Sequence, residues 1–336
     1  MRPETPWRAQ VGRGLALLCV AAAGLLSLVG SGGGLGFPPC EAPWCDNGPY
    51  VPPPALSVDP PYVTALVGSP VSFSARASGF TGTLSYSWSR SSDGTNFTEV
   101  AGASTATLTL PPVNLAQDAT VYRVQVRSST AQSLTAIGRL LVNASPGVVF
   151  SDGDFSSGRW RAYARENPSG VLPPHAEIFE PAGGAPGAWL SMLFQIPPGA
   201  GSAAVLYLRE DARYDPRAQG AIRVIDHAED CRTLKASDIR YAESHIAFEQ
   251  AGRRYSAIHS HVCNSTAWSG VPSRASFGAA DFTRIEGPAC AAGEACPDFS
   301  AAAPPLTFGF RRFVWGAPGD SIGHGLDNWR VTVWRR

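Results

Sequence analysis

The sequence predicts an all-β protein with two sandwich domains. Apolar residues alternate with small or polar residues in many short segments, and this period of two is typical of half-buried strands. The 336-residue chain has 35 glycines and 29 prolines, which divide these segments with turns. No long stretch has apolar residues at the spacing of an amphipathic helix. The length fits about two domains and an export segment.

The charge balance excludes one class of partner. Lysine and arginine together number 27, aspartate and glutamate also number 27, and the formal net charge is zero. A nucleic-acid-binding surface needs an excess of cations. We therefore expect no nucleic-acid partner. Lys235 is the single lysine of the chain, so its other basic side chains, histidine apart, are arginines.

Residues 1–34 have the composition of a targeting segment. Arg2, Arg8 and Arg13 precede an uncharged apolar run, Leu15–Val29, and small residues follow it. This order is typical of a signal peptide, and the run is shorter than the roughly 20 residues that cross a bilayer. We expect export to the periplasm, the cell surface or the medium. The alternative is an uncleaved N-terminal anchor, which would be the one contact with a membrane.

A linker and a first sandwich domain follow this segment. Residues 35–55 are rich in proline and glycine, which predicts an extended, semi-rigid linker. Residues 56–144 then show the alternation of a sandwich. Strands are predicted at Val71–Gly79, Leu84–Arg90, Ala106–Leu110, Asp118–Val124 and Ile137–Val142.

Several positions of this first domain resemble the immunoglobulin superfamily. Trp88 lies in the second predicted strand, and the run Asp118–Val124 carries an aspartate and a tyrosine at the superfamily spacing. The resemblance implies an immunoglobulin-like sandwich. Ala75 and Val124 stand where the superfamily has its two cysteines, a departure often found in bacterial members. The implied core therefore packs around Trp88 without an inter-sheet disulfide.

Residues 147–336 predict a second, larger sandwich. Short strand-like segments alternate with Gly, Pro and Asp turns, which predicts a jelly-roll-type antiparallel β-sandwich. The residues Arg232–Glu243 are expected to form a short helix or a loop. Strands are predicted at Val148–Phe150, Ala188–Ile196, Ala203–Leu208, Ala221–Ile225, His245–Phe248, Tyr255–Val262, Ala275–Phe282, Leu306–Val314 and Trp329–Trp334.

Three short motifs of this second unit resemble extracellular jelly-roll modules of the galactose-binding-like and concanavalin-like kinds. They are Phe155–Trp160 at its start, Gly183–Leu190, and Gly325–Val333 at its end. The resemblance implies that the first and last strands are neighbours. Asp152 and Asp154 would then meet Asp327. Calcium prefers six to eight oxygen ligands, so a structural calcium ion is expected there, with simple turns as the alternative.

The cysteines predict disulfides. Cys19 lies in the export segment and six cysteines follow it; an even number in an oxidising compartment favours disulfides. Six cysteines allow about 15 pairings, and a metal site is the alternative, although no pair has the two-residue spacing of a zinc knuckle. We predict bonds between nearest neighbours: Cys40–Cys45, Cys231–Cys263 and Cys290–Cys296.

Three tryptophans are candidate ligand-binding residues. The C–H face of a sugar stacks on an exposed aromatic ring, and Trp268 and Trp315 stand beside glycine-containing segments that predict loops. Trp189 is the third candidate, with burial in the core as its alternative. These residues predict a carbohydrate-binding surface on the second domain.

Two further patterns carry alternative chemistry. His259 and His261 would share one face of a strand, which suits zinc or copper with His227 or His245 as a third ligand; hydrogen-bonded histidines are the alternative. The run 319–323 matches the nucleophile-elbow pattern around Ser321, with His324 beside it. Too few residues follow Ser321 to supply the rest of a triad in chain order, so a glycine-rich turn is favoured.

Together these patterns predict a secreted or cell-surface binding protein without catalytic activity. In it, an immunoglobulin-like spacer presents a jelly-roll module that binds an extracellular glycan or another extracellular ligand, such as a protein. The first alternative is a structural or adhesion protein of the cell envelope that contacts other proteins. The second alternative is an exported hydrolase.

Overall fold

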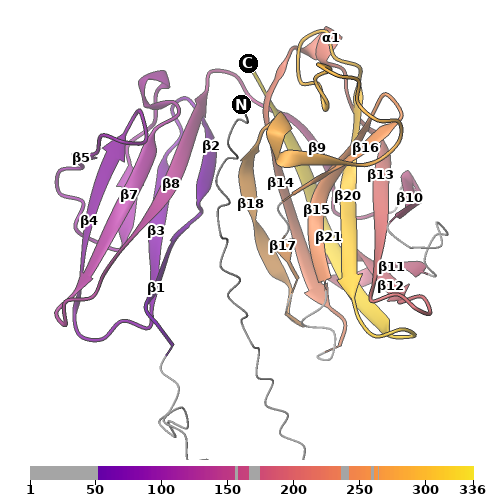
Figure 1. Ribbon diagram of the computed structural model, residues 1–336, viewed down its shortest axis with the longest axis horizontal. Coiled ribbons are helices and arrows are strands. Elements are labelled where there is room, and N and C mark those ends of the chain that lie inside the picture. The colour runs from indigo at the N-terminus through magenta and orange to yellow at the C-terminus, as the bar shows by residue number, and fades with distance from the viewer. Residues whose placement is uncertain (1–51, 156–157, 166–174, 236–241, 259–260, 264) are drawn as a thin grey trace, which may run out of the picture. The chain divides into compact units, whose positions relative to one another are not determined.

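The computed structural model describes residues 52–155, 158–165, 175–235, 242–258, 261–263 and 265–336 (Figure 1). Nearly all regular structure in these ranges is β-strand, which confirms the all-β prediction. The short helical segments are η1 (Leu115–Gln117), α1 (Pro216–Gln219) and η3 (Ala279–Asp281). Among the described residues, no helix has the length and apolar character of a membrane span.

The first sandwich consists of a three-stranded and a five-stranded sheet. All neighbouring strands are antiparallel except β2 and β8, which are parallel. The three-stranded sheet has the order β1 (Ala55–Asp59), β3 (Val71–Ser78), β6 (Thr107–Leu110). The five-stranded sheet has the order β2 (Tyr62–Leu66), β8 (Ser133–Asn143), β7 (Val121–Ser128), β4 (Leu84–Ser91), β5 (Thr98–Glu99).

The core of the first sandwich packs around Trp88, as predicted. Its indole is 1 % exposed, and its Nε1 donates to the carbonyl oxygen of Thr105 at 3.0 Å. Phe73 and Val124 are fully buried in the same cluster. Ala75 is also buried there. The apolar packing of inward-facing side chains therefore occupies the positions at which an immunoglobulin domain would have its inter-sheet disulfide.

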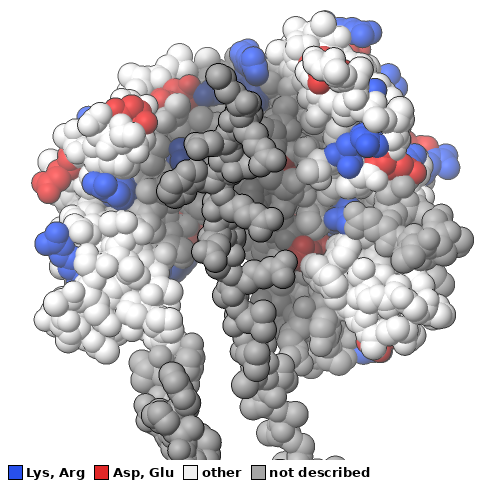
Figure 2. Space-filling model, in the orientation of Figure 1, with Lys and Arg blue, Asp and Glu red and all other residues white. Residues whose placement is uncertain are grey.

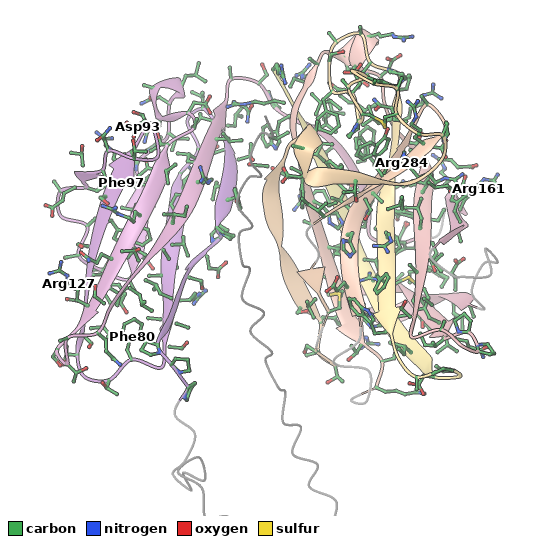
Figure 3. The ribbon with its side chains drawn as sticks, viewed as in Figure 1. Phe80, Asp93, Phe97, Arg127, Arg161 and Arg284 are labelled. Carbon is green, nitrogen blue, oxygen red and sulfur yellow. A yellow bond between two sulfur atoms is a disulfide. The ribbon has the colours of Figure 1, made fainter. Side chains whose placement is uncertain are left out.

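A polar turn joins β4 to β5 in this sandwich. The carboxylate of Asp93 accepts hydrogen bonds from the Ser91 hydroxyl at 2.7 Å and from the backbone N–H groups of Thr95 and Asn96, both at 2.8 Å. These hydrogen bonds hold the pKa of Asp93 well below its usual range, and the one from Ser91 has the largest effect. Figure 3 marks Asp93 and Phe97 along this connection. These hydrogen bonds stabilise the turn.

The second sandwich consists of a seven-stranded and a six-stranded antiparallel sheet. The seven-stranded sheet contains β10 (Trp160–Arg165), β13 (Ser202–Tyr214), β20 (Leu306–Trp315), β15 (Ala242–Gln250), β16 (Arg253–Ala257) and β19 (Phe282–Glu286), with β17 (His261–Val262) paired to β15. The six-stranded sheet contains β11 (His175–Gly184), β12 (Gly187–Gln195), β21 (Ser321–Arg335), β14 (Ile222–Thr233) and β18 (Ser269–Phe277), with β9 (Val148–Asp152) paired to β21.

The two sheets enclose one aromatic core. Its largest fully buried side chains include Phe194, Tyr207, Phe248, Phe308, Phe310 and Trp329. The first and last strands of this sandwich are neighbours: β9 pairs with β21, and Asp152 stands opposite Trp329. The finer assignment to a jelly roll of the galactose-binding-like or concanavalin-like kind stays a prediction.

Several strand predictions for the second sandwich need correction. The strand predicted at Ala221–Ile225 extends to Thr233, so Arg232 lies in β14 and not in a helix or loop. The segment Tyr255–Val262 is divided between β16 and β17. Cross-strand hydrogen bonds explain the extension of β14, because it pairs with β21 as far as Thr233. Pairing over such a distance in sequence cannot be read from local alternation.

β21 shows why the six-stranded sheet has a flat outward face. Its residues Ile322, His324 and Leu326 are buried toward the core. Gly323 and Gly325 alternate with them and therefore face outward. Because neither glycine has a side chain, the neighbouring side chains of β12 and β14 can lie across β21 at this point.

Candidate functional site

The structure brings two of the three predicted tryptophans together on the outward face of the six-stranded sheet. The Trp189 and Trp268 rings meet edge to face, with centroids 5.4 Å apart. Trp189 is 6 % exposed and Trp268 is half-buried. Their Nε1 atoms donate to the carbonyl oxygens of Ala182 and Gly183, at 3.0 and 2.8 Å. Both indoles are thus held in fixed positions.

Arg232 completes this cluster. Its guanidinium carbon lies 4.4 Å from the ring centroid of Trp189 and 4.8 Å from that of Trp268. A cation over an indole face is attracted by the ring quadrupole. We call the set of Trp189, Arg232 and Trp268 the indole–arginine platform. Sequence analysis did not select Arg232, because the stretch that begins with this residue was predicted as a helix or loop.

Gly325 forms the floor of the platform. A Cβ at this position would lie 3.0 Å from atoms of both the Trp189 and Trp268 rings, and 3.1 Å from Cγ of Arg232. Gly323 has the same relation to Leu234, whose side chain would lie 2.9 Å from an added Cβ. Leu234 and Leu193 are each 36 % exposed. The platform therefore has an apolar margin.

Asp327 holds the hairpin between β11 and β12 that supports the two indoles. Its Oδ2 accepts from the backbone N–H of Ala185 at 2.5 Å, and its Oδ1 accepts from the N–H of Asn328 at 2.6 Å. The Asn328 amide donates to the carbonyl oxygen of Ala185 at 2.6 Å and to Oδ2 of Asp230 at 2.7 Å. Burial raises the pKa of Asp327, and the nearby Asp230 charge adds to this effect.

The carboxylates predicted to bind calcium are used within the protein. Asp152 Oδ1 accepts from the backbone N–H of Phe155 at 2.8 Å, and its Oδ2 accepts from Nε1 of Trp160 at 2.9 Å. Asp154 is exposed. Within the described ranges, one compact group of three residues of metal-ligand type consists of Glu229, Cys231 and Cys263, but the two cysteine sulfurs are joined in a disulfide and offer no thiolate to a metal ion. The oxygens of Asp152 and Asp327 accept hydrogen bonds from N–H groups, and the calcium ion stays a prediction from the sequence.

Trp315 lies on the other sheet. It is at the end of β20, 39 % exposed, and its ring meets that of Phe313 edge to face with centroids 4.4 Å apart. The guanidinium of Arg311 lies 4.9 Å from the Phe313 ring centroid. The three predicted tryptophans therefore do not form one surface: Trp315 is separate from the indole–arginine platform.

Two of the predicted disulfides are present. Cys231 in β14 is bonded to Cys263, and Cys290 is bonded to Cys296. The predicted pairing of Cys40 with Cys45 lies outside the described residues. The backbone N–H of Cys263 donates to the carbonyl oxygen of Ala242 in β15 at 3.1 Å. The Cys231–Cys263 bond therefore ties the six-stranded sheet to the seven-stranded one.

A buried polar cluster that the sequence analysis missed surrounds this disulfide. Arg312 and Glu229 are fully buried; Arg312 Nη1 lies 3.2 Å from Oε1 of Glu229 and 3.0 Å from Sγ of Cys263. His324 is buried beside them, and burial, followed by the charge of Arg312, lowers its pKa to about 3. The signal in the sequence was Arg311–Arg312: two adjacent arginines in one strand place one of them in the core.

The serine and histidine of the nucleophile-elbow pattern do not converge. Ser321 is exposed, whereas His324 is buried toward the core, so they lie on opposite faces of β21. His227 belongs to β14, and its Nε2 lies 3.4 Å from Oε2 of Glu229. His245 belongs to β15, and its Nε2 lies 3.3 Å from Oε2 of Glu243. His259 and the side chain of His261 lie outside the described part of the chain.

Charge on the visible surface is sparse. Figure 2 shows lysine, arginine and acidic side chains scattered between larger uncharged areas. This distribution agrees with the neutral composition.

The match to a protein-family model falls within the first sandwich. A family model described as a domain of unknown function (DUF8696) matches residues 67–143. No curated protein matches the chain.

Among solved structures, the chain is similar to proteins with several immunoglobulin domains. One is the four N-terminal Ig domains of Dscam1 isoform 4.44, with 25% identity over 27% of this chain and 21% of that chain, and a TM-score of 0.23. Another is the eight N-terminal Ig domains of Down Syndrome Cell Adhesion Molecule isoform 1.30.30, with 17% identity over 46% of this chain and 21% of that chain, and a TM-score of 0.24. The match spans about a fifth of the length of these structures. TM-scores this low carry no argument about function.

Proposed function

We propose that this chain is an exported, non-catalytic binding protein whose second sandwich binds carbohydrate at the indole–arginine platform. One observation carries the proposal: Trp268 is half-buried on an outward sheet face, with its Nε1 fixed by the Gly183 carbonyl oxygen and its ring packed on Trp189. A rigid, partly exposed indole is suited to the C–H face of a sugar. The first sandwich serves as a spacer in this proposal.

Disulfides support the export part of the proposal. Cys231–Cys263 and Cys290–Cys296 are both formed, and disulfides persist mainly in oxidising compartments. The sequence pattern of residues 1–34 points the same way. The opposite orientations of Ser321 and His324 support the non-catalytic part, since a nucleophile and its base must be within hydrogen-bond reach.

The test is a glycan array on the full chain, followed by titration calorimetry with the best binders. We expect Trp268→Ala to weaken binding by at least about tenfold, because it removes the exposed part of the platform. Ile137→Ala, which changes an exposed apolar residue of the first sandwich, should have no effect. Trp315→Ala is the informative second variant: if it alone abolishes binding, the sugar site lies on the seven-stranded sheet.

A second function, adhesion through protein contacts, is favoured by one observation. β11 pairs with β12 at one end of the six-stranded sheet, and its Ile178 and Phe179 are 54% and 44% exposed. An edge strand with exposed apolar residues can pair with another chain. Absence of binding to every glycan, together with self-association that depends on protein concentration, would favour this function over the first.

A further inference from the structure

Arg232 is the one cation of the platform, and among the described residues its guanidinium contacts the two indole rings without a hydrogen-bond acceptor. Among the described residues, no hydrogen bond or ion pair involves this side chain, and its Nε is buried without an acceptor. A buried donor without an acceptor costs about 1–3 kcal/mol. The indole rings of Trp189 and Trp268 attract the cation but accept no N–H hydrogen bond of ordinary strength. The guanidinium therefore retains unused donors.

Two acidic residues close to Arg232 in the sheet are already engaged elsewhere. Asp230 precedes Arg232 by two residues, and its Oδ2 accepts from the Asn328 amide. Asp327 lies on the neighbouring strand, and both of its oxygens accept backbone N–H bonds. Among the described residues, no ion pair joins Arg232 to either carboxylate. A counter-anion for Arg232 is therefore not supplied by these two carboxylates.

We propose that the platform recognises the carboxylate of an acidic saccharide, a uronic acid residue, through Arg232; this inference rests on the proposed function. The planar fork of a guanidinium matches two coplanar oxygens of an oxyanion. The guanidinium carbon of Arg232 lies 4.4 and 4.8 Å from the two ring centroids and its Nε is buried, so its two Nη groups are the donors that a ligand would use. A sulfate ester offers the same oxyanion chemistry from another source.

The residues around Arg232 favour a saccharide as the molecule that contains this carboxylate. The floor of the platform is glycine, at Gly325 and Gly323, and its margin is formed by Leu193 and Leu234. A flat, apolar margin beside a single cation complements a sugar ring, which has one C–H face and, in a uronate, one carboxylate. Positive charge is confined to Arg232 within this platform.

The experiment measures binding of four probes to the full chain by titration calorimetry: oligogalacturonate, its methyl ester, sulfated dextran and unmodified dextran. We expect oligogalacturonate to bind, and its methyl ester to bind at least about tenfold more weakly, because esterification removes the charge but leaves the sugar chain. Arg232→Gln should weaken oligogalacturonate binding by a similar factor. Arg232→Lys should restore it only in part, since lysine lacks the fork.

Arg127→Gln is the matched control: it removes the same charge from an exposed arginine of the first sandwich, marked in Figure 3, and should leave binding unchanged. Equal binding of the ester and the acid, or unchanged binding by Arg232→Gln, overturns the inference while carbohydrate binding stands. Preference for sulfated dextran that is lost in Arg232→Gln supports the oxyanion chemistry with sulfate as its source. If no probe and no array glycan binds, the proposed function fails as well. Melting curves confirm that each variant is folded.

Discussion

At the scale of single residues, the feature with the largest consequence for stability is the buried ion pair of Glu229 and Arg312 in the second sandwich. Burial opposes the charge of Glu229, but Arg312 and then His227 outweigh it, so the pKa of Glu229 falls to about 2. Removal of one partner from such a pair leaves an uncompensated buried charge, which costs about 3–5 kcal/mol. Glu229 and Arg312 are therefore needed together, and neither faces a ligand.

His324 makes the stability of this cluster depend on pH. Its folded-state pKa is about 3, below its ordinary value of 6.5, because burial and Arg312 disfavour the cation. Between these values the unfolded chain binds a proton that the folded chain does not, so stability falls as pH falls. From pH 6.5 to about pH 5, this residue should lower the free energy of unfolding by about 2 kcal/mol.

Chemical denaturation of the parent chain and of His324→Leu across this range measures the effect. The variant should lose this part of the pH dependence, because leucine cannot take up the proton. Above about pH 7 both states of His324 are neutral, and the two stability curves should run parallel. An unchanged slope in the variant between pH 6.5 and 5 means that His324 does not titrate as its burial implies.

At the scale of elements, the β11–β12 hairpin and β21 together build the platform. The carbonyl oxygens of Ala182 and Gly183 accept from the two indoles, and the next residues, Gly184 and Ala185, lie against Asp327 of β21. Gly184 has no room for a side chain, since a Cβ would lie 2.5 Å from Oδ2 of Asp327. The position of the hairpin therefore sets the positions of Trp189 and Trp268.

Gly184→Ala tests this dependence. The added methyl group should displace the hairpin from Asp327, lower the free energy of unfolding by about 1–3 kcal/mol, and weaken ligand binding at the platform. Gly201→Ala is the control, because a Cβ at this exposed glycine meets nothing within 4 Å. Melting temperature and glycan titration are the two measurements. Normal binding by a destabilised Gly184→Ala protein would show that the hairpin does not position the indoles.

The strands and disulfides also show which parts of the structure could be predicted from the sequence. Alternation predicted the strands around Trp88, and cysteine order predicted both disulfides that the structure describes. Arg232 was missed because β14 is defined by its pairing with β21 and not by its own residues. Trp189 and Trp268 are 79 residues apart in the chain (268 minus 189), so only the order of the sheet could bring their rings together.

At the scale of the whole molecule, the two sandwiches are stabilised in different ways. The first has no cysteine at all, and its core is held by packing around Trp88. The second has the fully buried Cys231–Cys263 bond between its sheets and the Cys290–Cys296 bond in a loop. Reduction should therefore affect the second sandwich and leave the first one unchanged.

Paired cysteine substitutions measure the two contributions. A crosslink stabilises mainly by restricting the unfolded chain, and more so for longer loops. The sequence separations are 32 and 6 residues, so Cys231→Ala with Cys263→Ala should cost about 4 kcal/mol, and Cys290→Ala with Cys296→Ala about 2 kcal/mol. Denaturant unfolding of both double variants gives the difference. A larger loss of stability for the Cys290/Cys296 double variant than for the Cys231/Cys263 double variant would contradict this prediction.

The Cys231–Cys263 bond also has a mechanical consequence. Sheets in a sandwich resist tension only through non-covalent packing unless a covalent link joins them, and here that link runs from β14 to the chain beside β15. Stretched from its ends, the protein could extend its cysteine-free sandwich to full length, because no covalent crosslink shortens that part of the chain. The residues enclosed by the bond would stay folded back as a loop until the sulfurs are reduced, and Arg232 lies inside that protected loop.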